Sequence, residues 1–183
     1  VKASGGIDLA ATRFDELRVE AVIPQPGRLA PGLTGRPVTL RARLAGPFQN
    51  AQLGYLLTTP DLRQGKIALR DLRLSGEGRL AGGKGSFPIR LTARSLAIRN
   101  RTIDDRLRNL VLDGRIEKDG NRLRIAPTAI RASGFTGQLD GQADSASGSF
   151  AGNLRGGFNG LEFRGLGRLD LNAVLRLAKP ARG

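Results

Sequence analysis

The stretch "GRLDLNAVLRL", residues 167–177, alternates apolar and polar side chains along its length. In an extended strand, Leu169, Leu171 and Leu175 point to one side of the backbone. The intervening charged residues point to the other side, and Val174 is the apolar exception. Such a strand has one apolar face and one solvated face. The sequence therefore predicts a sheet whose leucine face something must cover.

The same alternation recurs through the chain, for example in residues 17–23, 38–44, 87–93 and 110–116. The pair Asp119-Gly120, directly after the last of these, is a strong hairpin signal. Alternating stretches follow one another about every 10 to 12 residues, with turn residues between them. This spacing favours antiparallel all-β structure with about 14 to 16 strands.

Two of these stretches change their apolar face partway along. Leu69 precedes Leu72, so the face changes sides at Asp71, and a second change falls before Leu96. A change of face predicts a bulge or a bend in the strand.

No break in composition divides the chain, so we expect one continuous unit over residues 1–183. Helical spacing is weak and confined to residues 59–66 and 102–110, which are too short to cover a sheet. The apolar face must then be shielded by a sandwich, by a closed barrel, or by a trough that holds another molecule.

The apolar residues are mostly aliphatic, with glycines among them and few aromatics, which gives a smooth surface suited to acyl chains. We therefore expect an all-β, elongated, twisted antiparallel structure with little helix, curled into an open hydrophobic groove. A plain β-sandwich interaction module remains an alternative.

The composition argues against an enzyme. The 183 residues include no cysteine and no histidine, which removes disulfides, thiol chemistry and the usual general base. The carboxylate pairs at 15–16 and 104–105 are adjacent, so on a strand they face opposite ways. Residues 78–86, "GRLAGGKGS", approach a phosphate loop, but Gly85 stands where a serine or threonine is needed and no helix follows. We expect a hairpin loop there, and no catalytic, cofactor or metal site.

The formal charge of +14 is large, and only five of the 30 basic residues are lysines. Such a charge favours acidic partners, including nucleic acid and anionic lipid surfaces. Binders of single-stranded nucleic acid combine a basic groove with stacking aromatics. Here aromatics make up 4% of the chain and the arginines are spread over nearly every strand. A basic nucleic-acid-binding sheet is therefore the less favoured alternative.

Three segments resemble a known family. Residues 107–144, "LRNLVLDGRIEKDGNRLRIAPTAIRASGFTGQLDGQAD", resemble a repeat of the TamB (translocation and assembly module) family. Residues 160–183, "GLEFRGLGRLDLNAVLRLAKPARG", are similar to the strand pair that often follows it, and residues 22–46 match more loosely. The resemblance extends to the wider AsmA-like group of bacterial envelope proteins. It is clearest over residues 97–183, about half of the chain.

The resemblance implies a long, open β structure with a hydrophobic inside, in the periplasm of a Gram-negative bacterium. It implies that phospholipid moves along the groove between the inner and outer membranes. It also implies work with an outer-membrane partner of the TamA kind in the translocation and assembly of proteins such as autotransporters. The family's N-terminal membrane helix and C-terminal conserved domain are not found here. We therefore expect an interior fragment of a larger protein, anchored to the inner membrane through a segment absent from these residues.

From the alternation and the resemblance we expect phospholipid acyl chains to lie on a row of apolar residues in the C-terminal half. These lining positions are Leu110, Leu112, Ile116, Leu123, Ile125, Leu139, Leu154, Phe163, Leu169, Leu171 and Leu175. A competing role in the same architecture is that an exposed sheet edge templates a strand of an outer-membrane client.

Overall fold

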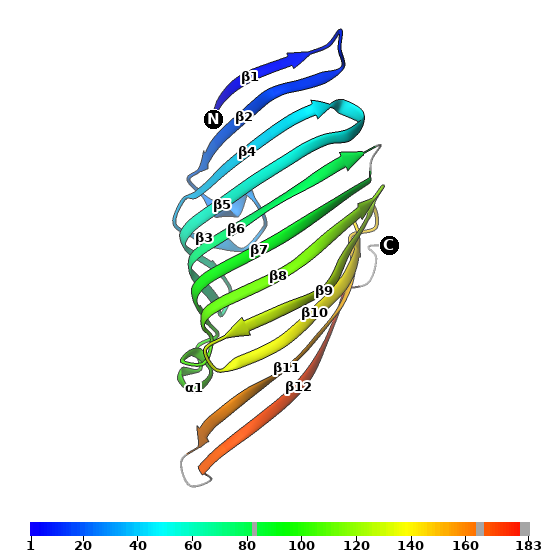
Figure 1. The fold of residues 1–183 in the computed structure, drawn as a ribbon. Coiled ribbons are helices and arrows are strands. Elements are labelled where there is room, and N and C mark those ends of the chain that lie inside the picture. Colours follow the sequence, from blue (N-terminus) through cyan, green and yellow to red (C-terminus); the bar gives the residue numbers. More distant parts are fainter. Residues whose placement is uncertain (82–83, 164–166, 180–183) are drawn as a thin grey trace.

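The computed structural model describes residues 1–81, 84–163 and 167–179 of the chain. Strands make up 77% of it and helical turns 6% (Figure 1). The strands are β1 (Lys2–Asp8), β2 (Arg13–Ile23), β3 (Leu33–Gly35), β4 (Val38–Pro47), β5 (Ala51–Gln64), β6 (Ile67–Ala81), β7 (Lys84–Ala97), β8 (Arg108–Asp119), β9 (Arg122–Ala132), β10 (Phe135–Asp144), β11 (Ser149–Phe163) and β12 (Gly167–Lys179). The helical turns are η1 (Pro26–Arg28), η2 (Phe48–Asn50) and α1 (Arg101–Asp104).

All strands belong to one antiparallel sheet, and their order in the sheet follows their order in the chain. The exception is β3, which lies off this path and pairs with the end of β5. The all-β antiparallel prediction is confirmed. The predicted 14 to 16 strands are wrong, because the described residues form a 12-stranded sheet in which β5, β6 and β11 reach 14 or 15 residues.

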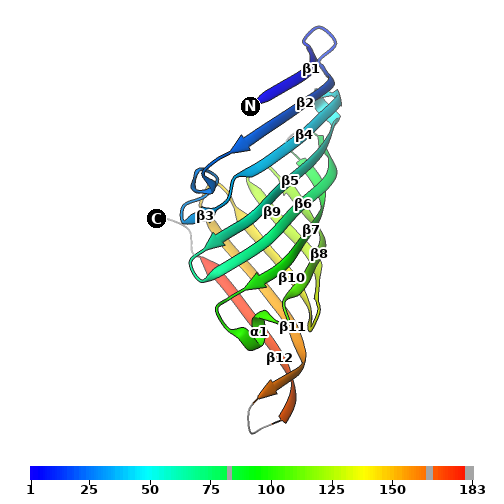
Figure 2. The same cartoon turned by 90° about the vertical axis from the view of Figure 1, so that its left-hand side faces the viewer.

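The sheet curls without closing into a barrel, and β9 to β12 cross behind the N-terminal strands in Figure 2. The chain exposes 12204 Å² to solvent, whereas a compact monomer of 19.5 kDa exposes about 8,500 Å². The excess is expected of a single curled layer without a second layer against it. Of the three arrangements considered for covering the apolar face, the open trough is the one that forms, and the sandwich alternative is wrong.

A sharp bend crosses strands β5 to β8. The pairs on either side of it place Pro60 opposite Asp71, Asp71 opposite Arg94, and Arg94 opposite Asn109. Asp71 and Asn109 have φ angles of 49° and 54°, in the left-handed region that interrupts a strand's alternation. Arg94 Nε lies 2.8 Å from Asp71 Oδ2 across the bend. We call these four residues the crease.

The crease bends the sheet toward its apolar face. The four crease residues are exposed, whereas their chain neighbours Thr59, Leu72, Ala93 and Leu110 are 2%, 6%, 4% and 7% exposed. An exposed apex with a buried inner corner shows that the apolar face is the concave one. The face changes predicted at Asp71 and before Leu96 are therefore confirmed as one bend. No register shift accompanies it between β5 and β6 or between β6 and β7, so it is not a bulge.

Of the two segments with weak helical spacing, one forms strand and turn and the other forms a short helix. Residues 59–66 form the end of β5 and the turn into β6, and residues 102–110 contain most of α1. The Asn100 side chain caps α1 by accepting from the Ile103 amide at 3.4 Å. Leu107, which follows α1, is buried at 6% exposure, and the neighbouring Arg106 donates to the Gly160 carbonyl, so this loop packs against β11.

A substitution at Asp71 tests the crease. Both Asp71→Gly and Asp71→Val remove the ion pair to Arg94, but glycine adopts a φ of 49° freely while a β-branched residue does not. We expect Asp71→Val to have a free energy of unfolding about 1–2 kcal/mol lower than Asp71→Gly. Urea denaturation followed by circular dichroism measures the difference. Equal stability of the two variants would show that the strand does not turn through a left-handed residue here.

Candidate functional site

A continuous apolar ladder runs across the concave face. Each of its members pairs with the next across ten neighbouring strands, from β2 to β12, over a distance of roughly 40 Å at the usual strand spacing. The first seven members are largely but not completely buried by their neighbours, so each keeps part of its surface open to the trough. The ladder consists of Ala21, Leu40, Leu57, Leu74, Leu91, Leu112, Ile130, Gly137, Gly156 and Ala173.

The structure places the described members of the predicted lining on this same face. Leu112 belongs to the ladder, Leu110 lies in the inner corner of the crease, and Ile116 pairs with Ile125. Leu123 lies two residues before Ile125 on β9 and shares its face. That these residues carry lipid stays a prediction.

The remaining predicted residues lie on the last three strands. Leu139 pairs with Leu154, and Leu154 pairs with Leu175, so one row crosses β10, β11 and β12. Leu171 lies opposite Phe158 and Leu169 opposite Leu161 on the same face. Phe163 ends β11, and its side chain lies outside the part of the chain that the structure describes.

Exposure rises along the trough toward the C-terminal edge. Leu110 is 7% exposed, whereas Leu169, Leu171 and Leu175 on β12 are 44%, 47% and 50% exposed. β12 is the last strand of the described sheet and pairs with β11 alone. The sequence predicts that something must cover the leucine face of residues 167–177. Among the described residues nothing covers it beyond the neighbouring strand β11.

The prediction missed the N-terminal half of the lining. Leu40, Leu57, Leu74 and Leu91 continue the row of Leu112 through β4 to β7. The same period-two alternation marks these strands, so the signal was present in the sequence. The predicted lining stopped short because it followed the C-terminal half, where the family resemblance is clearest.

Glycines on the concave face make room for neighbouring aromatic rings. A Cβ on Gly137 would lie 2.8 Å from the Phe135 ring, and one on Gly156 would meet the same ring. A Cβ on Gly152 would lie 2.9 Å from the ring of Phe150. The rings thus lie over glycine backbone on β10 and β11, where a side chain in place of the glycine hydrogen would collide with them.

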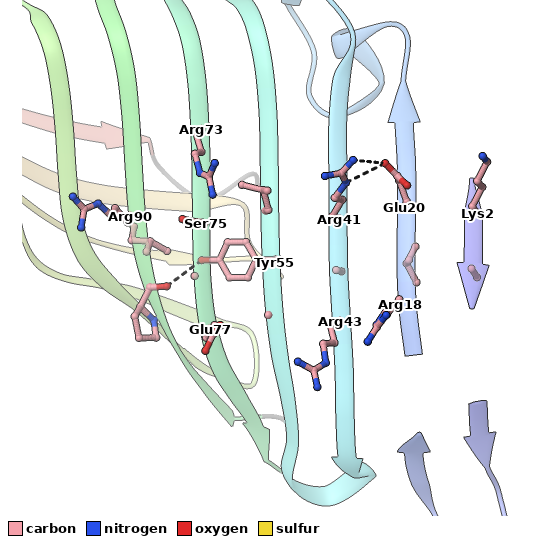
Figure 3. Close-up of a pocket in the computed structure, with 18 of the residues that line it drawn as sticks. Lys2, Arg18, Glu20, Arg41, Arg43, Tyr55, Arg73, Ser75, Glu77 and Arg90 are labelled. Carbon is pink, nitrogen blue, oxygen red and sulfur yellow. Dashed lines mark hydrogen bonds and ion pairs between the residues drawn. The ribbon is translucent and has the colours of Figure 1, made fainter. Parts of the chain in front are cut away.

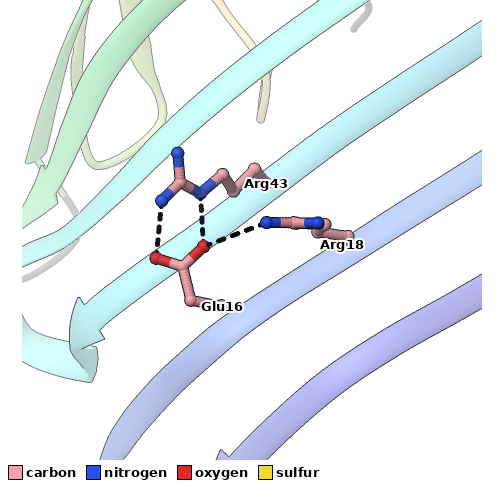
Figure 4. A network of polar contacts seen from close by, with 3 residues as sticks. All are labelled: Glu16, Arg18 and Arg43. Carbon is pink, nitrogen blue, oxygen red and sulfur yellow. Dashed lines mark hydrogen bonds and ion pairs between the residues drawn. The ribbon is translucent and has the colours of Figure 1, made fainter.

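The convex face carries the charged residues. Figure 4 shows Glu16 of β2 held by two arginines, with its carboxylate 2.7 Å from Arg43 Nε, 2.6 Å from Arg43 Nη2 and 3.7 Å from Arg18 Nη2. The hydrogen bond from Arg43, with the charge of that guanidinium, lowers the pKa of Glu16. The same partner raises the pKa of Arg43.

A hollow of about 1,040 Å³ lies on the convex face over β1, β2 and β4 to β8 (Figure 3). Five arginines line it. Arg18 lies on β2, and the other four, which we call the rim, are Arg41 and Arg43 of β4, Arg73 of β6 and Arg90 of β7. We call the whole depression the arginine hollow. The sequence predicts a basic outer face, but with arginines spread over nearly every strand. It did not predict that these four gather around one depression.

The carboxylates and the glycine-rich segment that the sequence analysis considered and rejected as catalytic sites have structural roles. Asp104 Oδ1 accepts the Ile98 amide at 2.8 Å, and Asp105 pairs with Arg108. Ala81 pairs with Lys84, so the phosphate-loop-like segment is a hairpin between β6 and β7, as predicted. Among the described residues no three histidine, cysteine or carboxylate side chains are grouped to hold a metal ion.

Comparison with protein-family models, with curated proteins and with solved structures found no match to this chain.

The Glu16 cluster makes stability depend on pH. Because its pKa is lowered from 4.5, the ionised carboxylate stabilises the fold above that pH, and this contribution is lost as the pH falls through the lowered value. We expect Glu16→Gln to melt at a lower temperature than the unmodified protein at about pH 7, and the gap to narrow as the pH falls below 4.5 and the carboxylate is protonated. Thermal melting followed by circular dichroism measures it. A gap that stays constant with pH would contradict this role.

Proposed function

We propose that the chain is a non-enzymatic lipid conduit of the TamB and AsmA-like kind, which carries phospholipid acyl chains along its concave face. The observation that supports this most is the unbroken apolar ladder on a sheet without a second layer. Exposed apolar surface of this extent marks a binding surface in a soluble protein. An aliphatic chain laid along it removes apolar area from water at roughly 25 cal/mol per Å².

The lining suits movement better than tight binding. Its members are aliphatic side chains and glycines, which offer no hydrogen-bond donor that would hold a lipid at one point. The open side of the trough leaves the headgroup in solvent while the acyl chains lie on the ladder. We propose on this basis that lipids slide along the row from β2 to β12 in either direction.

The same proposal suggests a cellular location. A protein that carries lipids along a groove would act between two membranes. The resemblance to the TamB family favours the periplasm, with attachment to the inner membrane by a segment outside these residues. None of the helices in the described ranges is long and apolar enough to cross a membrane.

A second role, in the assembly of outer-membrane proteins with a TamA-like partner, is favoured by the edge strand β12. Its outer edge has no partner strand among the described residues, and Leu169, Leu171 and Leu175 alternate along it in an exposed row. An unpaired edge with apolar side chains at every second position can accept a client strand by strand addition. Nucleic-acid binding is the remaining alternative, and it predicts tight binding of an oligonucleotide that weakens as salt is added.

Introducing a charge into the lining tests the conduit. Leu112→Glu places a carboxylate in the middle of the ladder, where an acyl chain would strip its water. Val111→Glu is the matched control, because Val111 is the next residue on the same strand and faces outward opposite Arg131. We expect Leu112→Glu to lower co-purified phospholipid roughly fivefold or more, and Val111→Glu to leave it unchanged, as measured by mass spectrometry of extracted lipid.

Leu175→Glu is a second lining variant that we expect to fold normally, because Leu175 is already 50% exposed. It separates loss of lipid from loss of the fold. It too should lose lipid. If the two lining variants retain as much lipid as the Val111→Glu control while keeping the β-sheet circular dichroism spectrum, the conduit proposal is wrong.

A further inference from the structure

The arginine hollow is shaped by small residues on its floor. Gly54 of β5 and Ser75 and Gly76 of β6 lie between the arginine-bearing strands β4 and β7. Two glycines and a serine leave room between these strands, and the longer side chains of Arg41, Arg73 and Arg90 stand around that room (Figure 3). Its volume of about 1,040 Å³ reaches the upper end of the range for small-molecule sites.

The charge around the hollow is unbalanced. Its lining includes six cations, the four arginines of the rim with Lys2 and Arg18, against the three carboxylates of Glu20, Glu77 and Asp113. The lining residues sum to +3, and Glu16, which pairs with Arg43 and Arg18 beside the hollow, lowers the local charge to +2. A depression lined by charges of one sign raises the local concentration of ligands of the opposite charge.

The rim arginines retain donors for a ligand. Arg41 donates to Glu20 at 3.0 Å, and Arg90 approaches Asp113 only to 3.7 Å. For Arg73 no ion pair or hydrogen bond of its side chain is found within the described residues. A guanidinium has five N–H donors in a planar fork, so one carboxylate partner leaves donors free for a phosphate.

We propose that the arginine hollow binds the phosphate headgroups of anionic phospholipids at a membrane surface. Arg73 and Arg90 donate to the phosphodiester oxygens, and the Ser75 hydroxyl donates from the floor. Arginines on the convex face are about two-thirds exposed, so a headgroup reaches them without a change in the sheet. This site lies on the face opposite the acyl lining and does not depend on the lipid-conduit proposal.

The alternative polyanion, nucleic acid, fits less well. Single-stranded nucleic acid stacks its bases on aromatic rings, and the aromatic residue that lines the hollow is Tyr55 (Figure 3). Its hydroxyl donates to the Pro88 carbonyl at 3.3 Å, and a Cβ on Gly76 would lie 2.6 Å from that hydroxyl. Tyr55 pairs with Gly76 across β5 and β6, and its ring is held against that glycine and Pro88. The lining therefore offers one tethered ring and not a series of stacking surfaces.

A charge-matched pair of variants tests the proposal. Arg73→Gln with Arg90→Gln removes two charges from the hollow. Arg131→Gln with Arg155→Gln removes two charges from the same face on β9 and β11, outside the hollow. Flotation with vesicles of phosphatidylglycerol and phosphatidylcholine, compared with phosphatidylcholine alone, measures binding. We expect the first double variant to bind the anionic vesicles roughly 30-fold more weakly than the unmodified protein, and the control less than about threefold.

Several results would overturn the proposal. Equal losses in the two double variants would mean that diffuse charge, and not the hollow, attracts the vesicles. No preference of the unmodified protein for anionic vesicles would also refute it. So would thermal stabilisation by millimolar inorganic phosphate without vesicle binding, or tight salt-sensitive binding of an oligothymidylate that only the hollow variant loses. Both double variants should keep their co-purified acyl lipid, which separates this test from that of the conduit.

Discussion

The interaction on which the rest of this structure depends is the burial of an apolar face by the bending of its own sheet. The strands alternate so regularly that one face is almost wholly aliphatic, and neither a second sheet nor a helix layer covers it in the described chain. Bending is then the remaining way to remove that face from water. The crease does this most sharply, because a left-handed residue in β6 and another in β8 let apolar side chains before and after the bend share one interior.

Much of this arrangement is readable from the sequence. Period-two alternation locates most strands, the Asp119-Gly120 pair locates the β8–β9 hairpin, and the change of face at Asp71 locates the crease. The alternation also tells which residues share a face, since pairing in a sheet preserves it. Strand length was harder to predict, because strands such as β5 continue through residues like Pro60 that usually end a strand.

The arginine hollow shows where sequence reasoning stops. Arg41, Arg73 and Arg90 lie on three different strands, and only the register of the whole sheet brings them around Ser75. Their individual alternation predicts an outward direction but not their mutual position. The two faces of the sheet thus carry separate chemistries over the same length, aliphatic on the concave side and cationic on the convex side.

The sequential order of the strands has a consequence for how such a sheet is built. Apart from β3, each strand pairs with its neighbours along the chain, so every strand–strand contact is local in sequence. Stability in a structure of this kind is close to a sum of nearest-neighbour terms, as in solenoids, and folding can begin at any hairpin and propagate both ways. Duplication or loss of a hairpin therefore changes the length of the molecule without altering its cross-section, so its span can be adjusted by evolution in steps of two strands.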